Sequence, residues 1–476
     1  MDISIFRAYS IRGIADQTLT AGDMRLIGQA TGTLLAEQGI DRAVVGRDVR
    51  VSSLGLSAAL IDGLLATGLH LIDIHTCVTP MLNWATDHYE AGAGLMVTAS
   101  HNPADYNGLK IRTDHSLGDQ ELARIYHVAA SGRFRQEQGT LTHHDPTADY
   151  LAAISNVVQI GQPLRVVVDA GNGAACDLSP ALIKLLGCKV IPLYCEPDGR
   201  FPNRIPDPTA PGALDALSAR VVEERADAGL GYDGDGDRLA MVDERGRVVF
   251  GDQLLTLLAQ QALCALKSAR TPKGARTPEG ASEYPGATVV YELSCTQALQ
   301  ETVEALGGTA IPCPVGYAFV HEAMRRHSAL LGGEAAGHLF FDQPGFLFDD
   351  AMLATARMLA LLGASKRPFS ALLADLPQYH LSPEHRFQCP DHLKQPVVQA
   401  VQSHFADQGF AIERMDGAKI HFGDGWALFR PSNTQPAVTL RCEAKTKVRL
   451  ETIECLMLDV VRDVLTTAGI TMRNAH

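Results

Sequence analysis

The sequence predicts a multi-domain α/β protein, because a buried strand, a turn and a helix follow one another three times. The first apolar strand ends in a glycine turn over residues 43–48. A second strand and its glycine turn cover residues 165–173 and lead into a helical pattern over 178–186. A third strand over 288–294 precedes a helical pattern over 297–306. Strands that alternate with helices in this way form the centre of a sheet in α/β units.

The chain has 476 residues, which is enough for about two to four domains. Polar or proline-containing stretches predict boundaries near 142–147, near 250–252 and near 376–383. At the second boundary, Asp252 is expected to cap a helix that runs through Leu258. The tail ends in an amphipathic helix, which favours an α+β domain. The predicted domains are 1–147, 148–250, 251–376 and 377–476.

One segment of the third domain is nearly duplicated. Residues 269–274 read Ala-Arg-Thr-Pro-Lys-Gly, and residues 275–280 read Ala-Arg-Thr-Pro-Glu-Gly. The segment is rich in proline and glycine and has no apolar anchors. We therefore expect a flexible surface insertion over about 267–286, without a catalytic role.

The composition excludes several classes of protein. With 46% hydrophobic and 20% charged residues the chain is typical of a globular protein, and no apolar stretch approaches a membrane span. The start lacks the basic and apolar regions of a signal peptide. Ten cysteines without a C-x-x-C pair favour reduced thiols. A net charge of −13 disfavours nucleic acid. We expect a cytoplasmic protein that binds neither nucleic acid nor membranes.

A serine stands where a strand ends. Residues 95–97 form an apolar run that predicts a buried strand, and a proline soon afterwards ends it. The chain returns as a second strand that carries Lys110. Ser100 lies between the two strands with His101 beside it. A serine hydroxyl is a weak nucleophile that needs a base or charged partners. A turn serine bonded to its own backbone is the alternative.

Three carboxylates alternate with glycines at Asp233, Asp235 and Asp237. Mg²⁺ binds oxygen ligands, and side chains at this spacing can point to one centre on a tight loop. A calcium loop is an alternative, with Glu244 at its twelfth position. However, Arg238 occupies the sixth position, where that loop needs glycine for its sharp turn. A solvated acidic turn is the third interpretation.

These two segments, together with three others in the same order, resemble the α-D-phosphohexomutases. Within that family the chain looks like the bacterial phosphomannomutase/phosphoglucomutase group. The resemblance covers the amino-terminal, phosphoserine, metal, sugar-recognition and phosphate-anchoring motifs, at residues 6–13, 98–103, 233–238, 333–338 and 430–436. It implies three similar α/β domains with mixed sheets and a C-terminal α+β domain around a central cleft.

The resemblance also implies a reaction. Ser100, phosphorylated at rest, would donate its phosphoryl group to a sugar hydroxyl. The resulting hexose 1,6-bisphosphate, which is also the activator, would turn over and return its other phosphate to Ser100. One Mg²⁺ would be bound by Ser100, Asp233, Asp235 and Asp237. The expected outcome is interconversion of hexose 1-phosphate and hexose 6-phosphate, with mannose, glucose or both as the sugar.

Fixed cations are needed at such a site. Three aspartates, a phosphoserine of charge near −2 and one Mg²⁺ sum to about −3, which would repel an incoming phosphate. Arg12, Lys110 and Arg238 can compensate near the chemistry, and Arg430 can do so at the remote phosphate loop. His101 and His338 are either proton shuttles or loop-stabilising residues. The catalytic candidates are Ser100, His101, Lys110, Arg12, Arg238 and His338.

The substrate candidates are divided between two grips. Glu334 would accept hydrogen bonds from sugar hydroxyls, and Arg430 would bind the phosphate that does not react. The resemblance implies a substrate site made by Tyr9, Glu334, Ala336, Tyr317, Arg430, Ser432, Asn433 and Thr434.

Three positions depart from the family pattern. Ala336 replaces the usual serine, Tyr317 a common histidine and Ser294 a common lysine. A glucosamine phosphate or other sugar mutase, a phosphoserine-dependent sugar phosphatase and a noncatalytic binding protein therefore stay as alternatives. Asn433 favours an unsubstituted hexose. The expected assembly is a monomer or a weak homodimer.

Overall fold

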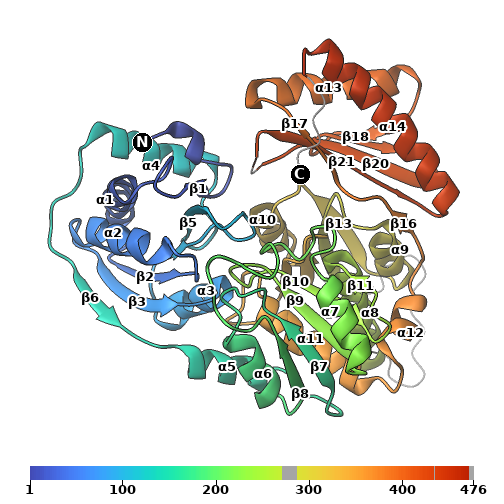
Figure 1. The fold of residues 1–476 in the computed structure, drawn as a ribbon, viewed down its shortest axis with the longest axis horizontal. Coiled ribbons are helices and arrows are strands. Elements are labelled where there is room, and N and C mark those ends of the chain that lie inside the picture. Colours follow the sequence, from blue (N-terminus) through green and yellow to red (C-terminus); the bar gives the residue numbers. More distant parts are fainter. Residues whose placement is uncertain (271–286, 434, 471–476) are drawn as a thin grey trace. The chain divides into compact units, whose positions relative to one another are not determined.

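The computed structural model describes residues 1–270, 287–433 and 435–470 (Figure 1). It contains two compact units, of which the first comprises Met1–Leu254 and Ala336–Leu373. The second comprises Leu255–Ala335 and Ala374–His476. The predicted multi-domain α/β fold is confirmed, while the division into four domains stays a prediction. Most of the expected insertion, residues 271–286, lies outside the described residues.

A six-stranded mixed sheet organises the amino-terminal part of the first unit. Its order is β1-β5-β4-β2-β3-β6. β2 pairs in parallel with β3 and β4, and β5 runs antiparallel between β1 and β4. A short 3-10 helix, η1 (Ile3–Ile5), precedes these strands: β1 (Ile11–Ile14), β2 (Arg42–Arg47), β3 (His70–Thr76), β4 (Ala93–Val97), β5 (Tyr106–Arg112) and β6 (Thr140–His143).

Alternation along the strands gives this sheet two apolar faces. Ala43 and Val45 of β2 belong to one core with α1 (Ala21–Glu37), α2 (Ser53–Leu65) and α4 (Asp119–Ser131). α3 (Thr79–His88) lies outside that core and packs against β2 and β4. A sheet covered on both faces leaves its strand ends as the place for polar side chains.

The second sheet of this unit has the order β11-β10-β9-β7-β8. β9 pairs in parallel with β7 and antiparallel with β10. The tight connection from β9 to β10 therefore contains the three aspartates. Strands, and not the helices of a calcium loop, flank this connection. The strands are β7 (Arg165–Asp169), β8 (Lys189–Leu193), β9 (Ala228–Tyr232), β10 (Leu239–Asp243) and β11 (Val248–Val249).

Helices complete the first unit around the second sheet. α7 packs against β7 and β9, and α11 against α5 and α6. Their bounds are α5 (Thr147–Asn156), α6 (Leu178–Leu185), α7 (Asp215–Glu223) and α11 (Ala351–Ala364), with α12 (Phe369–Ala374) after them and strand β15 (Leu339–Phe341) before α11.

One predicted helix differs from the structure. α8 (Gly251–Arg270) begins before Asp252, so Asp252 lies in its first turn and does not cap it. The helix also continues beyond Leu258, because buried apolar residues recur at helical spacing as far as Leu263. The prediction was wrong at both ends of this helix.

The second unit begins with a short parallel sheet. β12 (Thr288–Glu292) pairs with β13 (Thr309–Cys313) on one side and with β14 (Leu331–Gly333) on the other. α9 (Gln297–Ala305) and α10 (Tyr317–His327) pack against these strands. The strand-turn-helix pattern predicted over residues 288–306 is confirmed.

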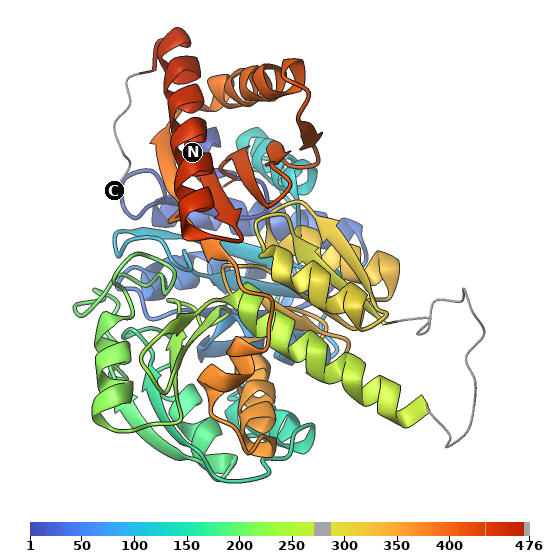
Figure 2. The ribbon, with the colours of Figure 1, turned by 90° about the vertical axis from the view of Figure 1, so that its right-hand side faces the viewer.

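The C-terminal part of this unit is an antiparallel sheet covered by two long helices (Figures 1 and 2). Ala427 and Phe429 pack in the core beneath the helices, and Trp426 and Leu428 point to the other face. The elements are β16 (His380–Leu381), β17 (His385–Gln388), α13 (Asp391–Asp407), β18 (Ala411–Glu413), β19 (Ala418–His421), β20 (Gly425–Pro431), β21 (Ala437–Ala444) and α14 (Lys447–Thr467).

Two expectations from composition can be compared with the structure. Every helix within residues 1–270, 287–433 and 435–470 falls short of the length and hydrophobicity needed to cross a bilayer. Each of the ten cysteines is a free thiol, as the absence of a paired pattern predicted.

Candidate active site

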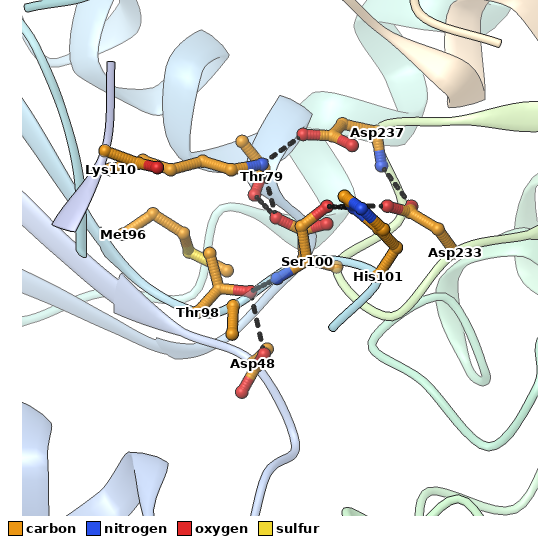
Figure 3. A network of polar contacts seen from close by, with 12 residues as sticks. Asp48, Thr79, Met96, Thr98, Ser100, His101, Lys110, Asp233 and Asp237 are labelled. Carbon is orange, nitrogen blue, oxygen red and sulfur yellow. Dashed lines mark hydrogen bonds and ion pairs between the residues drawn. The ribbon is translucent and has the colours of Figure 1, made fainter. Parts of the chain in front are cut away.

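Ser100 follows the fully buried strand β4 and is itself buried (Figure 3). Its backbone adopts a left-handed conformation with φ 51°, which is uncommon for a residue with a side chain. The Ser100 amide donates to Thr98 Oγ1 at 2.8 Å, and Thr98 Oγ1 donates to Asp48 Oδ2 at 2.7 Å. These bonds hold the strained loop in one conformation.

Two arginines bind the backbone of the same loop. Arg50 donates from NH2 to the carbonyls of Ser100 at 2.7 Å and Asn102 at 2.6 Å, and its Nε lies 3.1 Å from Asp48 Oδ2. Arg12 donates from NH1 to the Ala99 carbonyl at 2.9 Å. Arg12, which was predicted near the chemistry, is therefore in contact with the serine loop.

The three aspartates converge at this loop, as their spacing predicted. Asp233, Asp235 and Asp237 are buried, and one oxygen of each lies within 4.8 Å of the others. Ser100 Oγ donates to Asp233 Oδ2 at 2.9 Å. A Cβ on Gly234 would lie 2.5 Å from the Ser100 carbonyl oxygen, so glycine permits this close approach.

Lys110 supplies a cation directly to the carboxylates. It lies opposite Met96 in the β4–β5 register, and its Nζ donates to Asp235 Oδ2 at 2.7 Å and to Asp237 Oδ2. Thr79 Oγ1 also donates to Asp235 Oδ2, at 2.7 Å. The other oxygen of Asp235 is buried and accepts no hydrogen bond from the residues that the structure describes. A buried, unbonded oxygen between carboxylates fits a site for a hard divalent cation.

Burial and mutual repulsion affect the two outer carboxylates differently. Burial and the charges of Asp237 and Asp235 raise the pKa of Asp233 well above its usual value. Asp237 is equally buried, but Lys110 and His338 hold its pKa well below its usual value. Asp233, which accepts the Ser100 hydroxyl, is therefore the carboxylate of this pair that binds a proton more readily.

The two histidine candidates lie in different surroundings. His338 is buried, and its Nε2 lies 3.2 Å from Asp237 Oδ1 and 3.6 Å from Asp349 Oδ2. Arg238 Nε donates to the same His338 nitrogen at 3.3 Å. His101 is half-buried, with Nδ1 3.4 Å from Ser100 Oγ. Both predicted histidines and Arg238 are thus grouped with the serine and aspartates.

The second unit contains the predicted sugar and phosphate residues. Arg430 Nε donates to Asp416 Oδ2 at 2.8 Å, while its NH2 is buried without a hydrogen-bond partner in the described part of the chain. Lys394 Nζ donates to the Ser432 carbonyl at 2.9 Å, and Asn433 Nδ2 to the Val315 carbonyl at 2.9 Å. Thr434 lies outside the described residues.

Glu334 is buried close to a second carboxylate. Burial and the charge of Glu334 raise the pKa of Glu292. Ser294 donates its hydroxyl to Glu292 Oε1 at 2.6 Å, so this serine has a local structural partner. Tyr317 is buried at the first position of α10. Ala336 and Tyr9 are half-buried.

Four polar residues around the serine and the carboxylates escaped prediction from sequence: Asp48, Arg50, Thr79 and Asp349. A signal existed for the first two, because both follow a predicted strand, as Ser100 does. The carboxyl ends of parallel neighbours such as β2 and β4 meet at one edge of the sheet. Thr79 and Asp349 carry no comparable signal, because only tertiary packing brings them to the site.

Comparison with known proteins gives a consistent result across the chain. Four family models match, all described as phosphoglucomutase/phosphomannomutase. The three alpha/beta/alpha domain models match residues 4–136, 148–246 and 250–379, and the C-terminal domain model matches 384–459.

Individual relatives match over almost their full length. A phosphomannomutase/phosphoglucomutase of Pseudomonas aeruginosa is 35% identical over 462 residues, which is 97% of this chain and 96% of that protein. A phosphoglucomutase of Neisseria gonorrhoeae is 35% identical over 455 residues, covering 94% and 95%. The crystal structure of a family protein from Burkholderia thailandensis superposes with a TM-score of 0.86 at 32% identity, covering all of both chains.

Proposed function

This chain belongs to the phosphoglucomutase/phosphomannomutase family and is a hexose phosphate mutase, and we propose that Ser100 carries the phosphoryl group that it transfers. The observation that carries the proposal is the contact between Ser100 Oγ and the buried aspartates. Its hydroxyl lies 2.9 Å from Asp233 Oδ2, where a nucleophile and a cation site meet.

In the first half-reaction, a sugar hydroxyl attacks the phosphorus of phosphorylated Ser100. The bond from phosphorus to Ser100 Oγ breaks, a bond to the sugar oxygen forms, and the hydroxyl proton leaves to a base. In the second half, the sugar bisphosphate is reoriented and Ser100 Oγ attacks the other phosphorus. His101 and His338 are the side chains that we assign to the proton, because both are grouped with Ser100.

Asp233, Asp235 and Asp237 would bind one Mg²⁺ together with an oxygen of the phosphoserine. The three oxygens and the unbonded Asp235 Oδ1 suit that ion. When bound, Mg²⁺ supplies positive charge to the transferring phosphoryl group. Lys110 adds a fixed cation at the same carboxylates.

The second unit would bind the rest of the substrate. Arg430, Ser432, Asn433 and Thr434 would hold the phosphate that does not react, and the unpaired NH2 of Arg430 supports that role. Glu334 would accept hydrogen bonds from the sugar hydroxyls, while Tyr9, Tyr317 and Ala336 would complete its surroundings.

Intact mass tests the proposal. After incubation with hexose 1,6-bisphosphate and Mg²⁺, the native chain should gain one phosphoryl group and the Ser100→Ala chain none. The variant should also lose nearly all mutase activity. Ser155→Ala, which removes an exposed serine of α5, is the matched control. A Ser100→Ala chain that interconverts sugar phosphates normally would refute the mechanism.

The preferred sugar is proposed to be mannose, glucose or both. Rates with mannose, glucose and glucosamine 1-phosphates test this, and a glucosamine preference would redirect it. Release of inorganic phosphate without bisphosphate dependence would indicate a phosphatase instead. We further propose a monomer or weak homodimer that acts in the cytoplasm, and light scattering of the purified protein measures the oligomeric state.

A further inference from the structure

A second group of metal-binding side chains lies at the carboxyl ends of β3 and β6 and shares no residue with the candidate active site. β3 contributes Asp73 and His75, and β6 contributes His143. Parallel pairing sets Asp73 opposite His143. One potential ligand atom of each side chain lies within 4.8 Å of the others. Two neighbouring strands thus bring two imidazoles and a carboxylate to one point.

Both imidazoles face the same carboxylate oxygen. His75 Nδ1 lies 3.2 Å from Asp73 Oδ2, and His143 Nδ1 lies 3.4 Å from it. A charge-assisted hydrogen bond is shorter, at about 2.7–2.9 Å. Two ligand atoms that each lie about 2.1 Å from a shared ion are about 3.0–3.4 Å apart. The observed separations match ligands of a common ion better than a tight ion pair.

The local backbone holds this arrangement. His75 adopts a left-handed conformation with φ 61°, and its amide donates to Asp73 Oδ1 at 2.8 Å. The His75 and His143 rings are stacked, with centroids 5.0 Å apart and planes 6° from parallel. Arg47 lies 3.8 Å from Asp73 Oδ1, which leaves Oδ2 to the imidazoles.

We propose that Asp73, His75 and His143 bind one Zn²⁺ or a similar first-row divalent ion. Imidazole nitrogens suit such ions, whereas Mg²⁺ prefers oxygen ligands. Three protein ligands leave an open position for water.

The bound ion would fasten an exposed edge strand. All four residues of β6 are exposed, and the strand pairs with β3 just before the chain enters α5. An ion shared by the two strands would join β6 to the sheet through side chains as well as backbone. Binding to the folded chain alone would also raise its stability.

Calorimetric titration of the full chain with Zn²⁺ in excess Mg²⁺ tests this site. The native chain should bind one Zn²⁺, and His75→Asn or His143→Ala should weaken that binding at least about tenfold. Asparagine is chosen because it tolerates a positive φ. His70→Ala is the matched control, since His70 also joins the two strands, through Thr140 Oγ1 at 2.9 Å, without belonging to the cluster.

Thermal unfolding provides the second measurement. Zn²⁺ should raise the midpoint of the native and His70→Ala chains and leave that of His75→Asn unchanged. Mutase activity in Mg²⁺ alone should be the same in all three, so this test is separate from that of Ser100. Equal zinc affinity in His75→Asn, His143→Ala and the native chain would overturn the proposal, as would the absence of zinc binding in excess Mg²⁺.

Discussion

At the residue scale, the central feature is a serine hydroxyl held beside buried carboxylates by charged neighbours. Ser100 contacts Asp233, and Lys110 bridges Asp235 and Asp237. Removing either partner of such a buried pair leaves an uncompensated charge. The cations at this site are therefore as important to its integrity as the nucleophile.

Lys110→Met should lower the mutase rate about 10²–10³-fold, because a fixed donor at the reacting group is lost. Lys184→Met, at an exposed position of α6, should leave the rate unchanged. Steady-state kinetics with hexose 1-phosphate measures both variants, with circular dichroism to check folding. A Lys110→Met enzyme of native rate would contradict the role of this cation.

At the element scale, two loops meet because glycine replaces a side chain. Gly234 lies where a Cβ would be 2.5 Å from the carbonyl of Ser100. The metal loop can therefore approach the serine loop closely only without that atom. The same alternation of Asp and Gly that predicted a cation site also allows this approach.

Gly234→Ala should reduce activity strongly, because the serine loop and the metal loop must move apart. The control is Gly55→Ala in α2, where a Cβ would meet nothing within 4 Å. That helical substitution should stabilise the chain by roughly 0.5–1 kcal/mol and leave activity intact. Activity assays and urea unfolding of the two variants make the comparison. Native activity in Gly234→Ala would show that the close approach is unnecessary.

The first turn of α11 is expected to depend on pH. Asp350 accepts from the Leu353 amide at 2.8 Å and from Tyr150 at 2.9 Å, and burial raises its pKa to about 6. Its proton is bound more tightly in the folded than in the unfolded chain. This contribution to stability is therefore complete below about pH 4 and is lost as the pH rises towards 6.

Asp350→Asn keeps an acceptor at that position and removes the titration. Its stability relative to the native chain should rise between pH 4 and pH 7 by roughly 3 kcal/mol, at about 1.4 kcal/mol per pKa unit. Urea unfolding at the two pH values measures the difference. A difference that does not change with pH would refute the prediction.

At the scale of the whole molecule, the proposed work is divided between the two units. The described chemistry of Ser100 lies entirely in the first unit, and the proposed phosphate grip of Arg430 lies in the second. A reaction that must reorient a bisphosphate plausibly depends on motion between such parts. Binding and phosphoryl transfer should then be separable by mutation.

Arg430→Gln should raise KM for hexose 1-phosphate about 10- to 100-fold, the effect of losing a hydrogen bond to a charged group. The fall in kcat should be smaller, because this phosphate does not react. Arg462→Gln, at an exposed position of α14, serves as the control. An unchanged KM in Arg430→Gln would remove Arg430 from the substrate site.

Sequence alone predicted the elements and residues whose signals are local. The alternating strand and helix patterns predicted the α/β units, and the buried strand at residues 95–97 placed Ser100 at its end. The Asp-Gly repeat predicted three converging carboxylates. These features depend on short-range periodicity and turn chemistry, which a single sequence contains.

Only the tertiary structure decided which distant residues join them. Asp48, Arg50 and Thr79 reach the site because β4 pairs with β2 and α3 packs against both strands. Asp73 and His143 come together through the pairing of β3 with β6, across 70 residues of sequence. Such contacts depend on strand order and register, which are set by the packing of the whole core, whereas local patterns record only which residues are apolar.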